Sequence, residues 1–157
     1  MKILAIDPGY ERLGIAIINK ERGKKEALIH SECFKTDAKS PFEERLLEIG
    51  NKLEELISLH KPAVLAIETL FFSKNTKTAM RVAETRGAII YICKKNNLLI
   101  KEINPMEIKL AVTGDGKSDK HQIIKMVQLI LNMNKKTTDD EYDAIACGLA
   151  CGAFLKY

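Results

Sequence analysis

The sequence predicts an α/β protein with a five-stranded mixed sheet flanked by helices on both faces. Three short apolar runs follow one another near the amino terminus with turn residues between them, which favours an antiparallel meander. Two further short apolar runs then alternate with segments of helical periodicity, which indicates parallel strands joined by helices. At 157 residues the chain is expected to form one domain over residues 1–157.

The strands are predicted from the apolar runs and their boundaries. The five segments are Lys2–Ile6, Leu13–Ile18, Ala27–Phe34, Val64–Glu68 and Leu98–Ile103. Asp7-Pro8-Gly9 separates the first two as a turn. The fourth run is short and apolar throughout, which predicts a central strand covered on both faces.

Five helices are predicted from period and from their start and stop residues. Pro41 is expected at the first helical position of a helix that ends at Lys61-Pro62. The other four are roughly Thr76–Asn96, Pro105–Val112, Asp119–Leu131 and Thr138–Leu155. The loop Thr113–Ser118 ends in Gly-Lys-Ser, as a phosphate-binding loop does, but Ala111 replaces the glycine that motif needs and no strand precedes it. We therefore reject a P-loop.

The composition argues against a membrane protein, an exported protein and a zinc- or disulfide-stabilised protein. No apolar stretch approaches the ~20 residues of a membrane span, and the first residues are too short and too acidic for an export signal. A cytoplasmic protein with no membrane partner is expected. The four cysteines include no Cys-x-x-Cys pair, which indicates reduced, buried residues rather than zinc ligands or disulfides.

The most informative feature is a set of carboxylates on apolar segments. Asp7 ends the first run, Glu68 ends the fourth, and Asp140 and Asp143 open the last helix. Acids there are costly unless something binds them. If the first and fourth strands are neighbours, the four acids meet without lysine or arginine partners, and a hard divalent cation such as Mg²⁺ resolves their repulsion. One or two such ions support phosphoryl displacement.

Each acid also has a plainer explanation. Asp7 before Pro-Gly is often a turn residue, and the acids at 139–141 favour a helix start. Glu68 and Asp143 are harder to explain this way, because they lie within apolar patterns. Spacing alone does not choose Asp140 over Asp139, since Asp139 also shares a helix face with Asp143.

A basic stretch begins three residues after Glu68. Between residues 71 and 95 there are six basic residues and one acid. Basic side chains beside an acidic site suit a polyanion held during metal-dependent chemistry. On charge alone, a solvated helix face accounts for them slightly better.

Several motifs together resemble the bacterial RuvC-type Holliday junction resolvases. They are Ile6-Asp7-Pro8-Gly9, Ala66-Ile67-Glu68 followed by Phe71 and Lys74-Asn75, Arg86-Gly87, and Asp140-x-x-Asp143-Ala144. The resemblance is collinear over nearly the whole chain. It implies a ribonuclease H-like fold and a homodimer that nicks two opposing strands of a four-way DNA junction, leaving 5′-phosphate and 3′-hydroxyl ends. It also implies Mg²⁺ or Mn²⁺ dependence and partnership with the RuvA–RuvB branch-migration complex.

The resemblance also implies roles for individual residues. It selects Asp7, Glu68, Asp140 and Asp143 as catalytic metal ligands, Lys109 and Lys120 as basic residues near the scissile phosphate, and Phe71 as an aromatic that touches junction bases. Phosphate contacts are expected from five further basic residues: Lys74, Lys77, Arg81, Arg86 and Lys117. Two other functions remain to be weighed: an RNA-processing nuclease of the related YqgF type, and a junction-binding protein without catalysis. The junction-binding protein without catalysis is the poorer candidate, because unneutralised acids oppose binding of a polyanion.

Overall fold

The computed structural model describes residues 1–69, 76–134 and 136–155, without the side chains of residues 76 and 77. Its strands are β1 (Lys2–Asp7), β2 (Arg12–Asn19), β3 (Ala27–Lys35), β4 (Val64–Glu68) and β5 (Leu99–Ile103). Its helices are α1 (Phe42–His60), α2 (Thr76–Lys95), α3 (Pro105–Thr113), α4 (Lys120–Leu131) and α5 (Asp139–Phe154). These ranges lie within one or two residues of the predicted ones.

The strands form one mixed sheet in the order β3-β2-β1-β4-β5. β1 pairs antiparallel with β2, and β2 with β3, which confirms the predicted meander. β4 is parallel to both β1 and β5, so it is an interior strand, as its uniform apolarity predicted.

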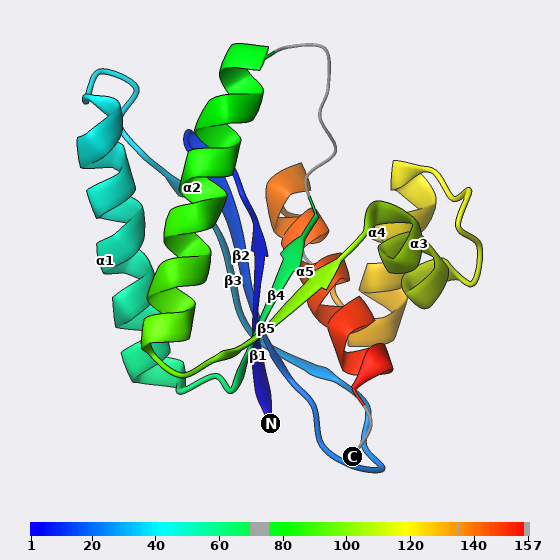
Figure 1. Ribbon diagram of the computed structural model, residues 1–157. Coiled ribbons are helices and arrows are strands. Elements are labelled where there is room, and N and C mark those ends of the chain that lie inside the picture. The colour runs from blue at the N-terminus through cyan, green and yellow to red at the C-terminus, as the bar shows by residue number, and fades with distance from the viewer. Residues whose placement is uncertain (70–75, 135, 156–157) are drawn as a thin grey trace.

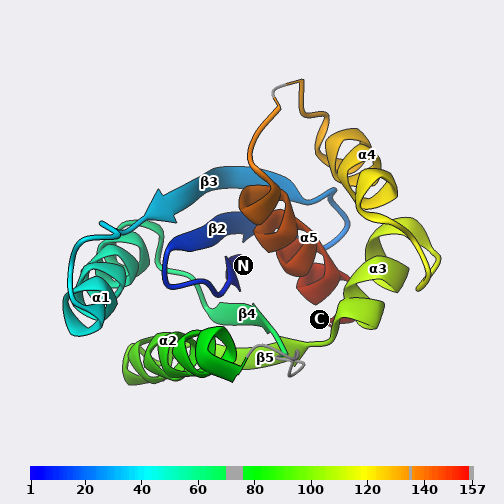
Figure 2. The ribbon, with the colours of Figure 1, turned by 90° about the horizontal axis from the view of Figure 1, so that it is seen from above.

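Helices cover both faces of the sheet, as Figures 1 and 2 show: α1 and α2 lie on one side, and α3, α4 and α5 on the other. The two faces differ in side-chain size. Large residues such as Leu4, Ile6 and Ile67 face α1 and α2, whereas Ala5 and Ala66 belong to the core formed with α5. The small residues leave room for a helix to come close.

α5 uses that room. Residues 144–152 of this helix are mostly alanine, cysteine and glycine, and all of them are buried. A Cβ on Gly148 would lie 2.7 Å from Ile18 Cγ1 and 3.0 Å from the Cβ of Ala5. Cys147 and Cys151 are buried free thiols on this helix, as predicted.

One boundary differs from its prediction. Pro41 is the N-cap of α1 and not its first helical residue, because its ψ of 153° is extended while its carbonyl accepts the first helical hydrogen bond, from the Arg45 N–H. Among the described residues, no helix combines the length and apolarity needed to cross a membrane.

Candidate active site

The acids predicted on β1 and β4 lie side by side. Ile6 pairs with Ile67 in the parallel ladder, so Asp7 and Glu68, the next residues, reach the same edge of the sheet. In Figure 1 the arrowheads of β1 and β4 point toward the end of the molecule at which α5 begins. Because side chains alternate along a strand, both acids point toward α5 with Ala5 and Ala66.

α5 brings the other two acids to this edge. Gly14 on β2 is the cross-strand partner of Asp7. A Cβ on Gly14 would lie 2.0 Å from the Asp140 backbone oxygen and 3.1 Å from the Asp7 Cβ. Only glycine therefore permits this approach, which sets Asp140 and Asp143 beside the strand ends.

The acids affect one another's ionisation. The pKa of Asp7 is raised to about 7, first by burial and then by repulsion from Asp143, Glu68 and Asp140, while Lys120 acts in the opposite direction. Burial and Asp143 raise the pKa of Glu68. Burial also raises the pKa of Asp143, and the bond from Lys120 offsets part of that rise. The edge thus carries negative charge that is costly without a bound cation.

Two of the four acids have basic partners, so the expectation that all four lack them is wrong. Arg12 Nη2 lies 2.6 Å from Asp140 Oδ2. Lys120 Nζ lies 3.0 Å from Asp143 Oδ2 and 3.2 Å from Asp139 Oδ2. Among the described residues, no three acidic, cysteine or histidine side chains are grouped closely enough to hold a metal ion.

A cleft of about 240 Å³ opens beside the acids. Glu68, Asp143, Lys109 and Lys120 all line it, so two predicted acids and both predicted lysines share one space. Lys120 is placed by the start of α4, where the Asp119 side chain accepts from the Gln122 N–H in a capping box. This arrangement can hold a phosphodiester between lysines and carboxylates.

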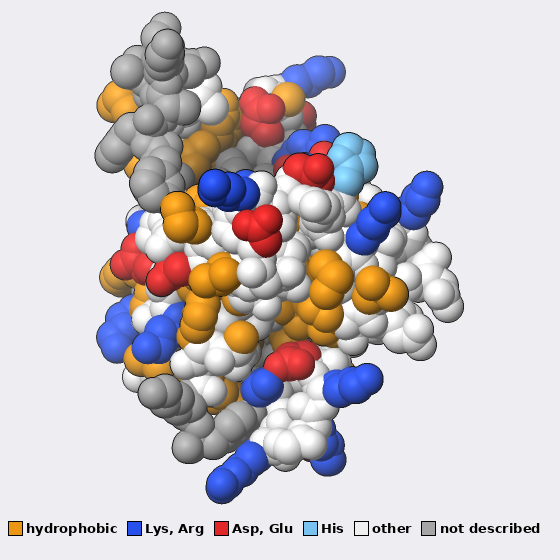
Figure 3. Space-filling view, turned by 90° about the vertical axis from the view of Figure 1, so that its right-hand side faces the viewer, with side chains coloured by type: hydrophobic (Ala, Val, Ile, Leu, Met, Phe, Trp, Pro, Cys, Tyr) orange, Lys and Arg blue, Asp and Glu red, His pale blue; other side chains and the backbone are white. Residues whose placement is uncertain are grey.

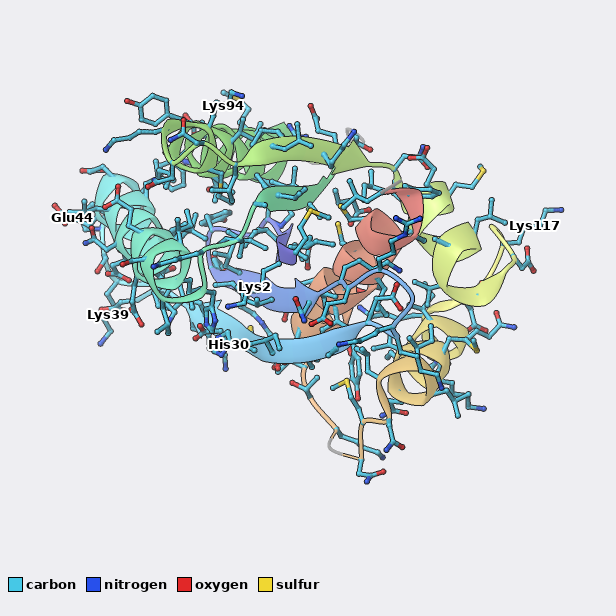
Figure 4. All side chains as sticks on the ribbon, turned by 90° about the horizontal axis from the view of Figure 1, so that it is seen from below. Lys2, His30, Lys39, Glu44, Lys94 and Lys117 are labelled. Carbon is cyan, nitrogen blue, oxygen red and sulfur yellow. The ribbon has the colours of Figure 1, made fainter. Side chains whose placement is uncertain are left out.

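The other predicted DNA contacts are less closely grouped. Lys117 is exposed and projects from the outer edge of the α3–α4 loop (Figure 4). On the side of the molecule seen in Figure 3, Lys and Arg side chains are scattered among acidic and hydrophobic ones. Arg81 is exposed, pairs with Glu84 at 3.1 Å and stacks over Phe42. Arg86 is largely enclosed and contacts the end of β4.

Three predicted contacts cannot be located. Phe71 and Lys74 lie outside the described residues. Lys77 falls within α2, but its side chain also lies outside the described part of the chain.

Sequence reasoning missed two neighbours of Asp140. The Cys33 Sγ donates to Asp140 Oδ2 at 3.6 Å, and Arg12 pairs with the same carboxylate. Cys33 is the cross-strand partner of Gly14, which pairs with Asp7. If the register of the first two hairpins is assumed, the alternation of side chains along the strands puts Arg12 and Cys33 on the same face of the sheet as Asp7.

The mixed sheet of this order has the ribonuclease H-like fold, and acids with adjacent lysines are the side chains that metal-dependent nucleases use. The family described as crossover junction endodeoxyribonuclease RuvC matches residues 3–151. The chain belongs to this family. Divalent-metal dependence is a property of this family of nucleases.

Comparisons with individual proteins agree with this family assignment. The crossover junction endodeoxyribonuclease RuvC of Caldicellulosiruptor saccharolyticus is 41% identical over 150 residues, which cover 95% of this chain and 90% of that protein. The Thermus thermophilus RuvC structure superposes with a TM-score of 0.90 at 27% identity, covering 98% of this chain and 95% of that one. T. thermophilus RuvC in complex with Holliday junction substrate gives a TM-score of 0.90 at 28% identity, with coverages of 96% and 92%.

Proposed function

We propose that the chain, as a single domain over residues 1–157, resolves four-way DNA junctions by nicking two opposing strands symmetrically. The products are a 5′-phosphate and a 3′-hydroxyl at each nick. The observation that carries this proposal is the cleft in which Glu68 and Asp143 face Lys109 and Lys120. Membership of the RuvC family supports the junction as substrate.

Asp7, Glu68, Asp140 and Asp143 are the residues that would hold one or two Mg²⁺ ions, with Mn²⁺ as a substitute. The fit is chemical: four carboxylates offer the oxygen ligands that Mg²⁺ prefers, and the raised pKa of Asp7, caused by burial and neighbouring acids, indicates charge that a cation would relieve. Held by these residues, such an ion would supply a more acidic water and stabilisation of charge on the leaving oxygen. In the structure, Arg12 pairs with Asp140 and Lys120 pairs with Asp143, and these ion pairs offset part of the negative charge.

The lysines bind the scissile phosphate. Lys120 is held next to Asp143, so its ammonium lies where a phosphate beside the acids would contact it. Lys109 reaches the same cleft from α3. Together they stabilise the negative charge that develops on the phosphate oxygens in the transition state.

The remaining DNA contacts follow from the family resemblance for Phe71 and from the positive charge of the other residues. Phe71 stacks on an unpaired base at the crossover. Lys74, Lys77, Arg81 and Lys117 hold phosphates without reading sequence. Of these, Arg81 and Lys117 are exposed, as this role requires.

The active form is a homodimer, because its two-fold symmetry matches that of a junction with two equivalent scissile strands. Support for the contact comes from the outer face of α2. Met80 is 66% exposed, Tyr91 is 69% exposed, and a Cβ on Gly87 would meet nothing within 4 Å. The enzyme acts in the cytoplasm with the RuvA–RuvB complex.

The test compares a synthetic four-way junction, a linear duplex and an RNA hairpin, each with and without Mg²⁺. Paired, symmetric, Mg²⁺-dependent nicks on the junction alone are expected. Asp7→Asn should abolish cutting and retain or tighten junction binding, because repulsion of phosphate falls. Asp37→Asn is the matched control, since Asp37 is exposed and accepts a bond from the Lys39 backbone N–H. Cleavage of the RNA alone, or normal cutting by Asp7→Asn, refutes the proposal.

A further inference from the structure

We propose that Arg86 is a positioning residue for Glu68 and not a phosphate ligand. This inference rests on the proposed function, in which Glu68 is a metal-holding acid. It replaces the sequence-based expectation that Arg86, like Lys77 and Arg81 on the same helix, contacts a DNA phosphate.

The guanidinium of Arg86 joins two strands from the α2 side of the sheet. Its Nε donates to the backbone oxygen of Glu68 at 3.1 Å. Its Nη2 donates to Oε2 of Glu102 on β5. The Arg86 side chain is only 15% exposed. One largely enclosed group therefore links the last residue of β4 to its neighbouring strand.

Glu68 needs such a link because the ladder ends there. Glu68 pairs with Ile103, the last residue of β5, and the next N–H along the chain, from Thr69, donates to the Ile103 oxygen. Beyond this point, the backbone has no further strand partner within the described residues. A hydrogen bond from a charged donor is stronger than a neutral one, so Arg86 fixes the peptide from which the Glu68 carboxylate extends.

The same contacts reduce the ability of Arg86 to hold DNA. Glu102 offsets its charge, and bidentate binding of a phosphate through Nε and Nη2 would require Arg86 to give up both partners. Arg81, five residues earlier on α2, differs. Its side chain is 48% exposed and its acid partner, Glu84, is itself on the surface.

The experiment compares Arg86→Ala, Arg86→Lys and Glu102→Gln with Arg81→Ala as the matched control. Junction binding is measured in EDTA across a salt series, and single-turnover cleavage is measured across a Mg²⁺ series. The rise in unfolding temperature on adding Mg²⁺, without DNA, gives a readout independent of activity.

For Arg86→Ala, we expect unchanged junction affinity and salt dependence, a higher Mg²⁺ requirement, a smaller Mg²⁺-induced rise in unfolding temperature, and cleavage slower by at least about tenfold. Glu102→Gln should move the same quantities by a smaller factor, and Arg86→Lys should partly restore them. Arg81→Ala should instead weaken binding and lower the salt slope by about 0.9.

A loss of affinity and salt slope in Arg86→Ala, with an unchanged Mg²⁺ requirement, overturns the proposal. If Arg86→Ala does not fold, Arg86→Lys and Glu102→Gln decide by the same criteria. If the wild type cuts no junction, the proposed function fails, and the role of Arg86 is still judged by the Mg²⁺-induced stabilisation.

Discussion

Replacing Asp7 with asparagine should stabilise the metal-free protein at alkaline pH. The pKa of Asp7 rises from 3.8 to about 7, chiefly because the side chain is buried and then because three acids surround it. That difference of roughly 3 units, at about 1.36 kcal/mol each, means that ionised Asp7 costs about 4 kcal/mol of folding free energy. Asparagine has nearly the same shape and carries no charge, so it removes this cost.

The pH dependence has a definite sign. Because the folded pKa lies above the unfolded one, the native state retains a proton that the unfolded chain has released between pH 3.8 and about 7. The stability of the wild type therefore falls relative to the variant as pH rises through that window. At pH 5 Asp7 is mostly protonated in the folded protein, so much of the difference disappears.

Thermal unfolding in EDTA at pH 5 and pH 8 measures this effect. At roughly 2–4 °C per kcal/mol for a chain of this size, Asp7→Asn should unfold about 10 °C above the wild type at pH 8. Adding Mg²⁺ should raise the unfolding temperature of the wild type more than that of Asp7→Asn. Asp37→Asn should behave as wild type. Equal unfolding temperatures at pH 8, or a gap of the same size at pH 5, would refute the electrostatic reasoning.

Two substitutions and one chemical modification test the surroundings of the site. Gly14→Ala should abolish junction cutting and destabilise the protein by about 1–3 kcal/mol or more in chemical denaturation, because its Cβ would lie 2.0 Å from the Asp140 oxygen. Asp119→Ala should lose about 1 kcal/mol by removing the capping box of α4. In the native protein, a thiol reagent should modify Cys33 first in a thiol titration, because Cys33 is half-buried and the other three cysteines are buried.

The two substitutions each have a control. Gly152→Ala adds the same methyl group with its nearest neighbours at 3.7 Å, and it should be neutral or stabilising by up to about 1 kcal/mol. Asp119→Asn keeps a capping oxygen and should remain close to wild type. Full cutting by Gly14→Ala, equal stability of the two Asp119 variants, or reaction of all four thiols at one rate would contradict the respective prediction.

The sequence predicted the sheet well because its signals are local. Apolar runs such as Val64–Glu68, and breaks such as Asp7-Pro8-Gly9, set the strands without knowledge of the rest of the chain. The meeting of Asp7 and Glu68 depended on one assumption, that β1 and β4 are neighbours, and the ladder confirms it.

What the sequence could not predict depends on contacts between distant elements. The partners of Asp140 come from β2 and β3, and their approach requires a register that no local pattern specifies. Spacing also could not separate Asp139 from Asp140. In the structure the Asp139 side chain is 68% exposed and pairs with Lys120, whereas Asp140 is among the acids that raise the pKa of Asp7. Its selection as a metal ligand remains a prediction.

The distribution of the acids along the chain has a consequence for protein synthesis. Asp7 belongs to the first strand, whereas Asp140 and Asp143 belong to the last helix, which packs against that strand. A ribosome must therefore synthesise the chain as far as Asp143 before the two groups can meet. Incomplete translation products contain Asp7 and Glu68 but lack the later acids. Under the role proposed for the four acids, a partly made chain could not cut DNA.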